Sequence, residues 1–358
     1  MSMLGYPKDS SQERLIAVDD LEAFIKALLI KNRMFPADAK IATARMIEAD
    51  MRGIVSHGTR ALERYLPSIE MADIDPRAEI VTEVDTPAMA VLNGSQGMGH
   101  VAATKAMQLA VQKAKAVGTG TVVVKNSHHY GACGVYALLA AEQGTIGYTT
   151  TSAGKPNVVV PGTKAGGETN HGIAWACPNP NGAPIVLDMA VAESSWGKIE
   201  TLAEYGVPIP EHWAFSEEGT PTTDGRQATL LNPIAGPKGF GLAFFASLVT
   251  GGLGGRKLAI EKTRAVATEG GEHFFYALDI EQFTDRSKFD ERLASAIEKI
   301  RQLPPTPETD RVTLPGEREW EMAQQTRQDG LSLHEKHVAA LEQLGRQHKV
   351  DVPWKTTS

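Results

Sequence analysis

The segment from Ser56 to Tyr65 carries the residue types that proton transfer and carboxylate binding need. It reads Ser-His-Gly-Thr-Arg-Ala-Leu-Glu-Arg-Tyr, so Arg60 and Arg64 follow His57 by three and seven residues. In one continuous helix, both arginines would lie within about 60° of His57, and Tyr65 would lie about 80° to its other side. Histidine titrates near neutral pH, and arginine matches a carboxylate with two parallel hydrogen bonds. We therefore expect this face to bind a small organic acid, although a solvated basic helix face would show the same spacing.

A second group of candidate side chains follows an apolar strand expected at residues 121–124. The chain there reads Asn126-Ser-His-His-Tyr-Gly131, with histidines at positions 128 and 129. Loops at strand ends often carry chemistry, so His57 and His129 are alternative candidates for a general acid or base. We expect no metal, because adjacent histidines rarely bind one ion and the chain has no His-Glu-x-x-His motif or paired cysteines.

Two further segments suit a phosphate-containing cofactor. Asp188 ends an apolar strand, where a carboxylate can accept hydrogen bonds from ribose hydroxyls or, alternatively, cap a helix. Lys238 and Gly239 open a helix, and a helix N-terminus attracts phosphate, although an ordinary surface lysine is the alternative. The turn at residues 94–99 lacks the glycine spacing of the dinucleotide fingerprint, which argues against a standard Rossmann domain.

Composition places the chain among ordinary globular proteins. Its 358 residues are 42% hydrophobic and 22% charged, with a formal net charge of −7. There is no long basic run, so nucleic acid is not an expected partner. No apolar stretch is long enough for a membrane span, and we expect no signal peptide. The two cysteines, Cys133 and Cys177, suit a reducing cytoplasm.

Helices and strands must position these groups, and hydrophobic periodicity predicts where they lie. Helices are expected at both chain ends, with alternating strands and helices between them. The expected strands are 88–92, 121–124, 147–151, 185–187 and 273–279. The expected helices are 19–32, 36–51, one that carries His57 and ends near residue 73, 100–117, 135–143, 239–251, 289–302, 317–328 and 333–347.

The motifs occur in an order that resembles one family. They are Ser-His-Gly followed by Arg and Tyr65, Gly-x-x-Gly-x-Gly, Asn-Ser-x-His-Tyr-Gly, Thr-Asn, Leu-Asp-Met-Ala, Gly-Lys, Pro-Lys-Gly-x-Gly-Leu, and Pro-Gly-Glu-x-Glu followed by Gly330-Leu331. This order resembles the type 2 malate/L-lactate dehydrogenase family, from about residue 19 to about residue 344. That family also includes ureidoglycolate dehydrogenase, sulfolactate dehydrogenase, 2,3-diketogulonate reductase and Δ1-piperideine-2-carboxylate reductases.

The resemblance implies an α/β fold in which a non-Rossmann mixed sheet domain binds NAD or NADP. That domain would span residues 76–284. A helical domain on the substrate side would combine residues 12–75 and 285–350, and the protein would form a homodimer. The resemblance places catalytic roles on His57, Tyr65 and His129. It places cofactor contacts on Lys155, Asp188, Met189, Ala190, Lys238, Gly239, Gly316, Glu317 and Arg318.

The expected function is a cytoplasmic NAD(P)-dependent oxidoreductase. It would transfer a hydride between nicotinamide and a small 2-hydroxy or 2-oxo acid, with a small carboxylate as its substrate. Two alternatives remain open. One is the reduction of a cyclic 2-imino acid, and the other is a non-catalytic relative that binds ligands.

The chain departs from the family pattern at several positions. The family arginine four residues after the histidine is Ala61 here, so Arg60 is the first candidate for the carboxylate clamp and Arg64 the second. We expect the loss of this arginine to affect substrate identity. Three further departures, described next, should affect cofactor choice. The family's Gly-Thr-Asn-Pro reads Glu168-Thr-Asn-His171, its Pro-(Phe/Trp)-Gly-Gly reads Pro161-Gly-Thr-Lys164, and the Thr-Ser after Asp-Met-Ala reads Val191-Ala192.

Overall fold

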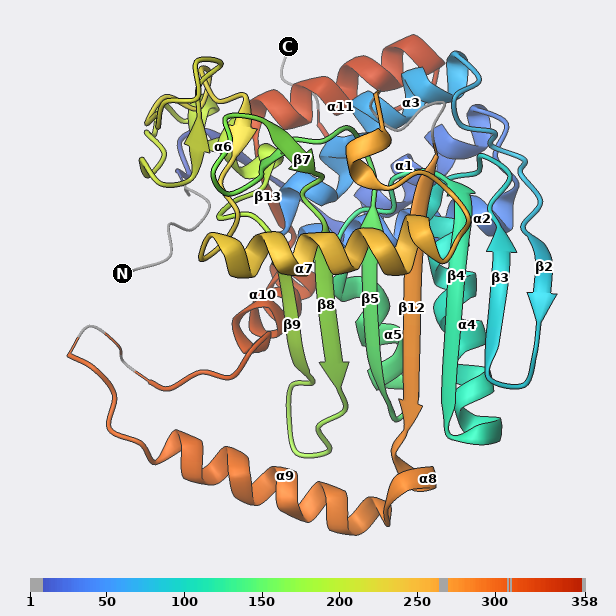
Figure 1. Ribbon diagram of the computed structural model, residues 1–358. Helices are drawn as coiled ribbons and strands as arrows, with labels where there is room; N and C mark the ends of the chain where they lie inside the picture. The colour runs from blue at the N-terminus through green and yellow to red at the C-terminus, as the bar shows by residue number, and fades with distance from the viewer. Residues whose placement is uncertain (1–8, 264–269, 308, 310, 356–358) are drawn as a thin grey trace.

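A seven-stranded mixed sheet occupies the centre of the molecule (Figure 1). The computed structural model describes residues 9–263, 270–307, 309 and 311–355. The strand order is β2-β3-β4-β12-β5-β8-β9, and β3 and β4 form the one parallel pair of this sheet. This topology differs from a doubly wound parallel sheet. The strands are β2 Val81–Asp85, β3 Met89–Asn93, β4 Thr119–Ser127, β5 Thr145–Ser152, β8 Gly172–Cys177, β9 Ile185–Ala190 and β12 Gly271–Asp279.

Helices cover the two faces of this sheet unequally. On one face lie α4 (Gly99–Val117) and α5 (Gly134–Glu142), with α7 (Pro237–Ser247) across the other (Figure 1). Small buried alanines along α4 let it approach β4 closely, and a Cβ at Gly120 would overlap the carbonyl oxygen of Ala110. The α7 helix continues into a π-helical turn, Leu248–Gly252.

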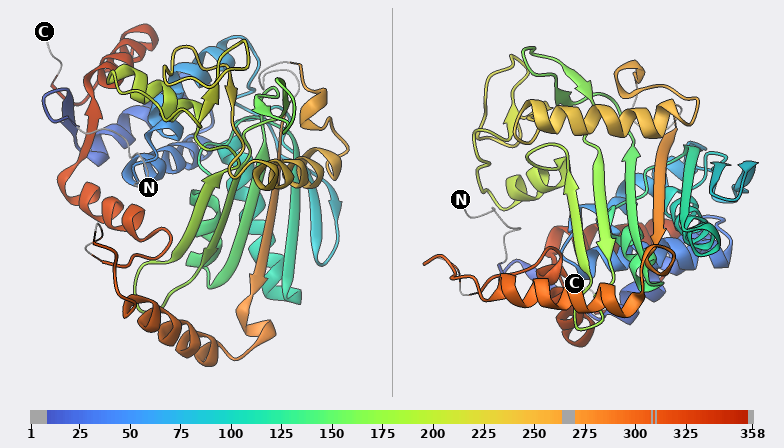
Figure 2. Two further views of the ribbon diagram at one scale, coloured as in Figure 1. Left: turned by 60° about the vertical axis from the view of Figure 1, so that its left-hand side comes forward. Right: turned by 60° about the horizontal axis from the view of Figure 1, so that its bottom comes forward.

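The two ends of the chain meet in a helical layer beside the sheet (Figure 2). The strand β1 (Glu13–Ile16) pairs in antiparallel fashion with β13 (Leu331–His334). The helices around this pair share one apolar core, because their buried positions recur at helical spacing. These helices are α1 Val18–Lys31, α2 Pro36–Met51, α3 Leu62–Glu70, α10 Glu317–Asp329 and α11 Glu335–His348.

A small four-stranded sheet forms a third part, next to α6 (Trp196–Glu204). Its strands are β10 Ala214–Phe215, β11 Leu230–Leu231, β6 Val158–Val159 and β7 Gly166–Glu168. The short helices α8 (Ile280–Phe283) and η4 (Ala259–Glu261) link larger elements. Finally, α9 (Arg286–Arg301) runs past one end of the main sheet and buries none of its residues (Figure 2).

Most expected helices and strands are present within a few residues of their predicted bounds, but the segment after Ser56 differs. It is not one continuous helix. Two 3-10 turns, η1 (Val55–His57) and η2 (Thr59–Ala61), precede α3. Gly58 between them lies in a turn and is not helical, with φ −94° and ψ −141°. The Asp50 carboxylate occupies the space beside Gly58 and accepts hydrogen bonds from the amide and hydroxyl of Thr59, at 2.9 and 2.6 Å, which holds the break.

Two other expectations also need correction. The strand β9 continues to Ala190, so Asp188 lies within the strand and not at its end. The expected helix at 333–347 starts later, because residues 331–334 form the strand β13. Within the described ranges, no helix has the length and apolarity that a membrane span requires.

Candidate active site

His57 lies on η1, where neighbouring side chains fix its ring. Its Nδ1 is 2.8 Å from the Oγ of Ser56. The N-terminal turn of α6 packs against this serine, and a Cβ at Gly197 would overlap the Ser56 side chain. Close packing between η1 and α6 therefore requires a residue without a side chain at position 197.

His129 comes from the loop after β4 and meets Tyr65 of α3. The Oη of Tyr65 is 2.7 Å from Nδ1 of His129, and the amide of Gly131 donates to the same nitrogen at 3.3 Å. The rings of His57 and His129 stack with their centroids 5.7 Å apart. Three of the four expected catalytic residues thus come together from three separate elements.

The surroundings of these rings set their protonation at neutral pH. Burial and, to a smaller extent, the charge of Arg64 together lower the pKa of His57 to about 4. Burial also holds the pKa of His129 well below 6.5, with additional contributions from His57 and Arg64. Burial raises the pKa of Tyr65 above its usual value of 10. At pH 7 both imidazoles are therefore neutral and the phenol keeps its proton, so the near-neutral titration expected from residue type does not apply.

The two candidate arginines lie in different environments. Arg60 donates to the Oγ1 of Thr201 at 3.2 Å and forms an ion pair with Glu204, both on α6. Arg64 is exposed on α3, and its charge lowers the pKa of His57 and His129. Because residues 56–65 are not one helix, the angular argument that placed both arginines on the face of His57 fails.

Two additional buried histidines, His100 and His128, contact the ring of Tyr65. The ring of His100, at the start of α4, meets that of Tyr65 edge to face at 5.3 Å, and His128 does so at 6.2 Å. Burial lowers the pKa of His100 to about 3 and that of His128 to about 4. Gly131 has a φ of +81°, and a Cβ there would lie 2.9 Å from Nε2 of His100. The sequence analysis assigned no catalytic role to His100, because nothing in its local pattern shows that its ring meets Tyr65.

The expected cofactor segments lie side by side along β9 and the chain that follows it. Gly316 starts α10 against β9, and a Cβ there would be 2.7 Å from that of Val186. Gly239 of α7 packs near the carbonyl oxygen of Val191. Asp188 accepts a hydrogen bond from the amide of Gly134, at 2.8 Å, which matches the alternative interpretation as a helix cap for α5. The side chains of Lys155 and Lys238 are exposed, and Lys155 lies in the separate loop after β5.

Comparison with known proteins places this fold and these motifs in one group. The family model described as malate/L-lactate dehydrogenase matches residues 16–342. The chain belongs to this family. The predicted resemblance is thereby confirmed.

Curated relatives and solved structures agree with this assignment. The chain is 34% identical to a malate dehydrogenase of Pyrococcus abyssi, over 92% of this chain and 94% of that protein. It is 33% identical to an L-sulfolactate dehydrogenase of Methanocaldococcus jannaschii, over 83% and 86%. The solved malate dehydrogenase of Pyrococcus horikoshii OT3 matches with a TM-score of 0.88 at 30% identity, over 98% of this chain and 100% of that one. These matches confirm the expected α/β class.

Proposed function

We propose that this family member is an NAD(P)-dependent dehydrogenase that interconverts a small 2-hydroxy acid and its 2-oxo acid. The observation that carries the proposal is the meeting of His57, Tyr65 and His129, which three separate elements bring together. Neutral imidazoles beside a protonated phenol suit the transfer of one proton to or from a substrate oxygen. A protein that only binds ligands would not need this arrangement.

His57 is better suited than His129 to be the acid or base. The Nδ1 of His129 accepts from the Gly131 amide, so the neutral ring carries its proton on Nε2 and can only donate there. The Nδ1 of His57 faces a serine hydroxyl, which can accept or donate, so either tautomer is allowed. Within the described residues, no hydrogen bond engages Nε2 of either ring. We therefore assign proton transfer to His57, and orientation of the substrate oxygen to His129 and Tyr65.

Arg64 replaces Arg60 as the proposed carboxylate clamp. Glu204 already neutralises Arg60, whereas no carboxylate of the described chain pairs with Arg64. The charge of Arg64 acts on both catalytic histidines, so a carboxylate bound to it would lie beside their rings. A guanidinium can hold that carboxylate with two parallel hydrogen bonds.

The residues along β9 fit a nicotinamide dinucleotide. The exposed Lys238 offers positive charge to a diphosphate at the first turn of α7. Residues 188–190 lie within β9, Gly316 packs against Val186 of the same strand, and Lys155 offers a further exposed cation. When bound, the nicotinamide accepts or supplies the hydride, while the protein contributes orientation and charge.

We also propose a homodimer, because the sheet face crossed by α7 keeps large apolar side chains exposed. Trp175 and Leu187 lie directly opposite each other on β8 and β9 and are 40% and 42% exposed. On α7, Phe245 is 68% exposed. Apolar patches of this kind mark protein interfaces. Light scattering at micromolar concentration should return twice the chain mass, and a Trp175→Glu variant should shift the mass towards that of one chain. A wild-type mass of one chain would contradict the dimer.

Two further proposals complete this assignment. The helical layer is the substrate-side domain and the main sheet is the cofactor domain, since the catalytic side chains face the sheet from η1 and α3. The protein acts in the cytoplasm, which its two free cysteines suit.

The decisive experiment measures the oxidation of NADH and of NADPH with a panel of 2-oxo acids and cyclic 2-imino acids. We expect turnover of at least one 2-oxo acid with one of the two cofactors. Turnover of cyclic imines alone would support the imino acid reductase. Cofactor binding without turnover of any panel member, detected as a shift in unfolding temperature, would support a non-catalytic relative.

A further inference from the structure

Two positions at which the chain departs from the family motif contact each other. Glu168 ends β7 and His171 precedes β8, and both are at most 2% exposed. The Nε2 of His171 is 2.9 Å from an Oε of Glu168, and its Nδ1 is 2.7 Å from the carbonyl oxygen of Thr151. A carbonyl oxygen only accepts, so Nδ1 carries a proton and a second proton lies between Nε2 and the carboxyl group. The result is a buried hydrogen bond in which the two side chains share this proton.

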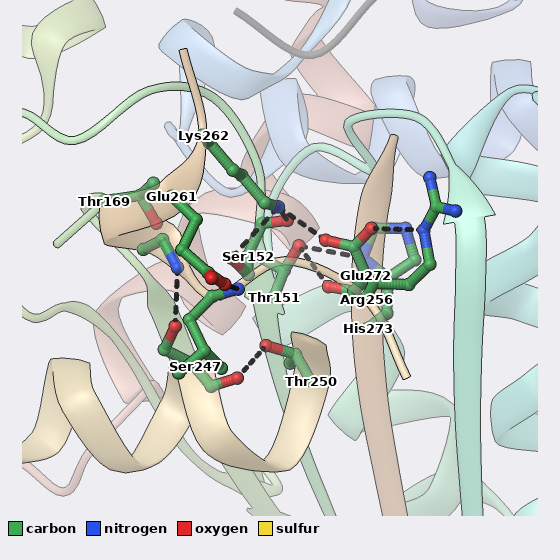
Figure 3. A network of polar contacts seen from close by, with 12 residues as sticks. Thr151, Ser152, Thr169, Ser247, Thr250, Arg256, Glu261, Lys262, Glu272 and His273 are labelled. Carbon is green, nitrogen blue, oxygen red and sulfur yellow. Dashed lines mark hydrogen bonds and ion pairs between the residues drawn. The ribbon is translucent and has the colours of Figure 1, made fainter. Parts of the chain in front are cut away.

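On the side of Thr151, hydrogen bonds connect this pair to the loop after β4 that carries His128 and His129, which we call the catalytic loop. The hydroxyl of Thr151 is 2.8 Å from Nδ1 of His273 (Figure 3). Nε2 of His273 is 3.1 Å from the carbonyl oxygen of His128. Burial lowers the pKa of His273 to about 3, so this ring is neutral. It therefore accepts from Thr151 and donates to the carbonyl of His128, the residue before His129.

The strand β5 that carries Thr151 is held from its other side as well. The ammonium of Lys262 lies 2.5 Å from Glu272 and donates to the carbonyl oxygen of Ser152 at 3.1 Å (Figure 3). Both members of this ion pair are at most 3% exposed. The end of β5 thus has little freedom to move, and a shift of its Thr151 would be passed on to His273.

The other side of the pair leads to the chain that follows β9. The side-chain oxygen of Asn170 accepts from the amide of Ala192 at 3.0 Å, and its amide donates to the carbonyl oxygen of Ser194 at 2.9 Å. The carbonyl oxygen of His171 accepts from the amide of Val191 at 3.0 Å. Residues 191–194, which continue from the expected cofactor segment, are therefore held by the same turn that carries the pair.

We propose that Glu168 and His171 are positioning residues that hold the catalytic loop at 128–129 and the segment 191–194 in one mutual arrangement. The inference rests on the proposed function, because it assigns these two segments to substrate and cofactor. The physical reason is that removing one partner of a buried hydrogen bond leaves the other unsatisfied, and catalytic geometry tolerates only small displacements. Neither residue touches the reacting groups.

The test compares variants that break the path at different points. Glu168→Gln removes the charge from the pair and keeps its shape, so it should raise the KM for the nicotinamide cofactor and lower kcat, each by about threefold or more, which is about tenfold in kcat/KM. Thr151→Val removes only the hydroxyl that reaches His273. It should lower kcat and leave the cofactor KM unchanged, because the contacts of residues 170 and 171 with 191–194 remain.

A matched control lies outside this path of contacts. Glu342 of α11 is a buried carboxylate that pairs with Arg14 at 2.8 Å. Glu342→Gln should lower the unfolding temperature but leave kcat per folded molecule and both KM values unchanged. If Glu168→Gln and Thr151→Val both behave like this control, the pair has only a structural role and the inference is wrong.

Amide hydrogen exchange provides a readout that does not depend on activity. Glu168→Gln should speed exchange at residues 128–131 and 191–194, whereas Thr151→Val should do so at 128–131 alone. Unchanged exchange at both segments in Glu168→Gln would overturn the inference. If the exchange pattern appears but the wild-type protein neither binds nicotinamide cofactors nor turns over any 2-oxo acid, the mechanical link holds and the proposed function is what fails.

Discussion

The phenol of Tyr65 lies 2.7 Å from Nδ1 of His129, although 64 residues separate them in the sequence. Together with the amide of Gly131, this contact leaves the proton of the neutral imidazole on Nε2. His129 can then donate a hydrogen bond to a substrate oxygen, while His57 beside it stays free to exchange a proton. His57 and His129, whose rings stack on each other, thus acquire different roles because their Nδ1 atoms have different hydrogen-bond partners.

Asparagine substitutions separate the two roles. His57→Asn should lower kcat by about a hundredfold or more, because it removes the group that exchanges the proton. His129→Asn should raise the KM of the 2-oxo acid and lower kcat less, since it weakens an orienting hydrogen bond. Steady-state measurements of kcat and KM for both variants test the assignment. A larger loss of kcat in His129→Asn than in His57→Asn would exchange the two roles.

Lysine substitutions identify the carboxylate clamp. Arg64→Lys should raise the KM of the acid substrate and lower kcat/KM by roughly tenfold, because lysine cannot form two parallel hydrogen bonds with a carboxylate. Arg60→Lys is the control, because that side chain faces Glu204 and not the histidines. Loss of kcat/KM in Arg60→Lys with wild-type kinetics in Arg64→Lys would restore Arg60 as the clamp.

The pH dependence of the oxidation reaction should reflect the buried state of His57. A base must be unprotonated, and the pKa of His57 is lowered to about 4. The value of kcat/KM for the 2-hydroxy acid should therefore rise with pH around 4 and stay level through neutral pH. An acid limb near 6.5, the value for a solvated histidine, would show that the free enzyme exposes this ring to water.

Asp50 should make folding stability depend on pH. Burial raises its pKa from 3.8 to about 7, so between these values the folded chain holds a proton that the unfolded chain releases. Its contribution to stability is fully present below pH 3.8 and is lost as pH rises through 7. Asp50→Asn should flatten this part of the profile and raise the unfolding free energy at pH 8 by at most roughly 4 kcal/mol. Chemical denaturation of both proteins from pH 4 to 8 measures the difference, and parallel profiles would contradict it.

Local sequence patterns were sufficient for most helices and for several strands. Apolar residues at helical spacing predicted α1, a proline in the first turn predicted the start of α2, and a glycine after an alanine-rich run predicted the end of α4. Eight strands of the described chain were not predicted: β1, β2, β6, β7, β8, β10, β11 and β13. Several of them depend on partners far along the chain, such as β13 for β1, and a short apolar run does not show which partner it will find.

The sequence by itself determined which residue types were available for chemistry, the family and the helices that carry Tyr65 and His100. Only the tertiary structure decided how they are used. The carboxylate of Asp50 breaks the expected helix at Gly58, and Glu204 neutralises Arg60. Burial shifts the pKa of His57 away from neutral pH, and Glu168 meets His171. Each of these four outcomes depends on a contact between side chains or on the exclusion of water. Such contacts and such burial arise only when distant segments of the chain pack together.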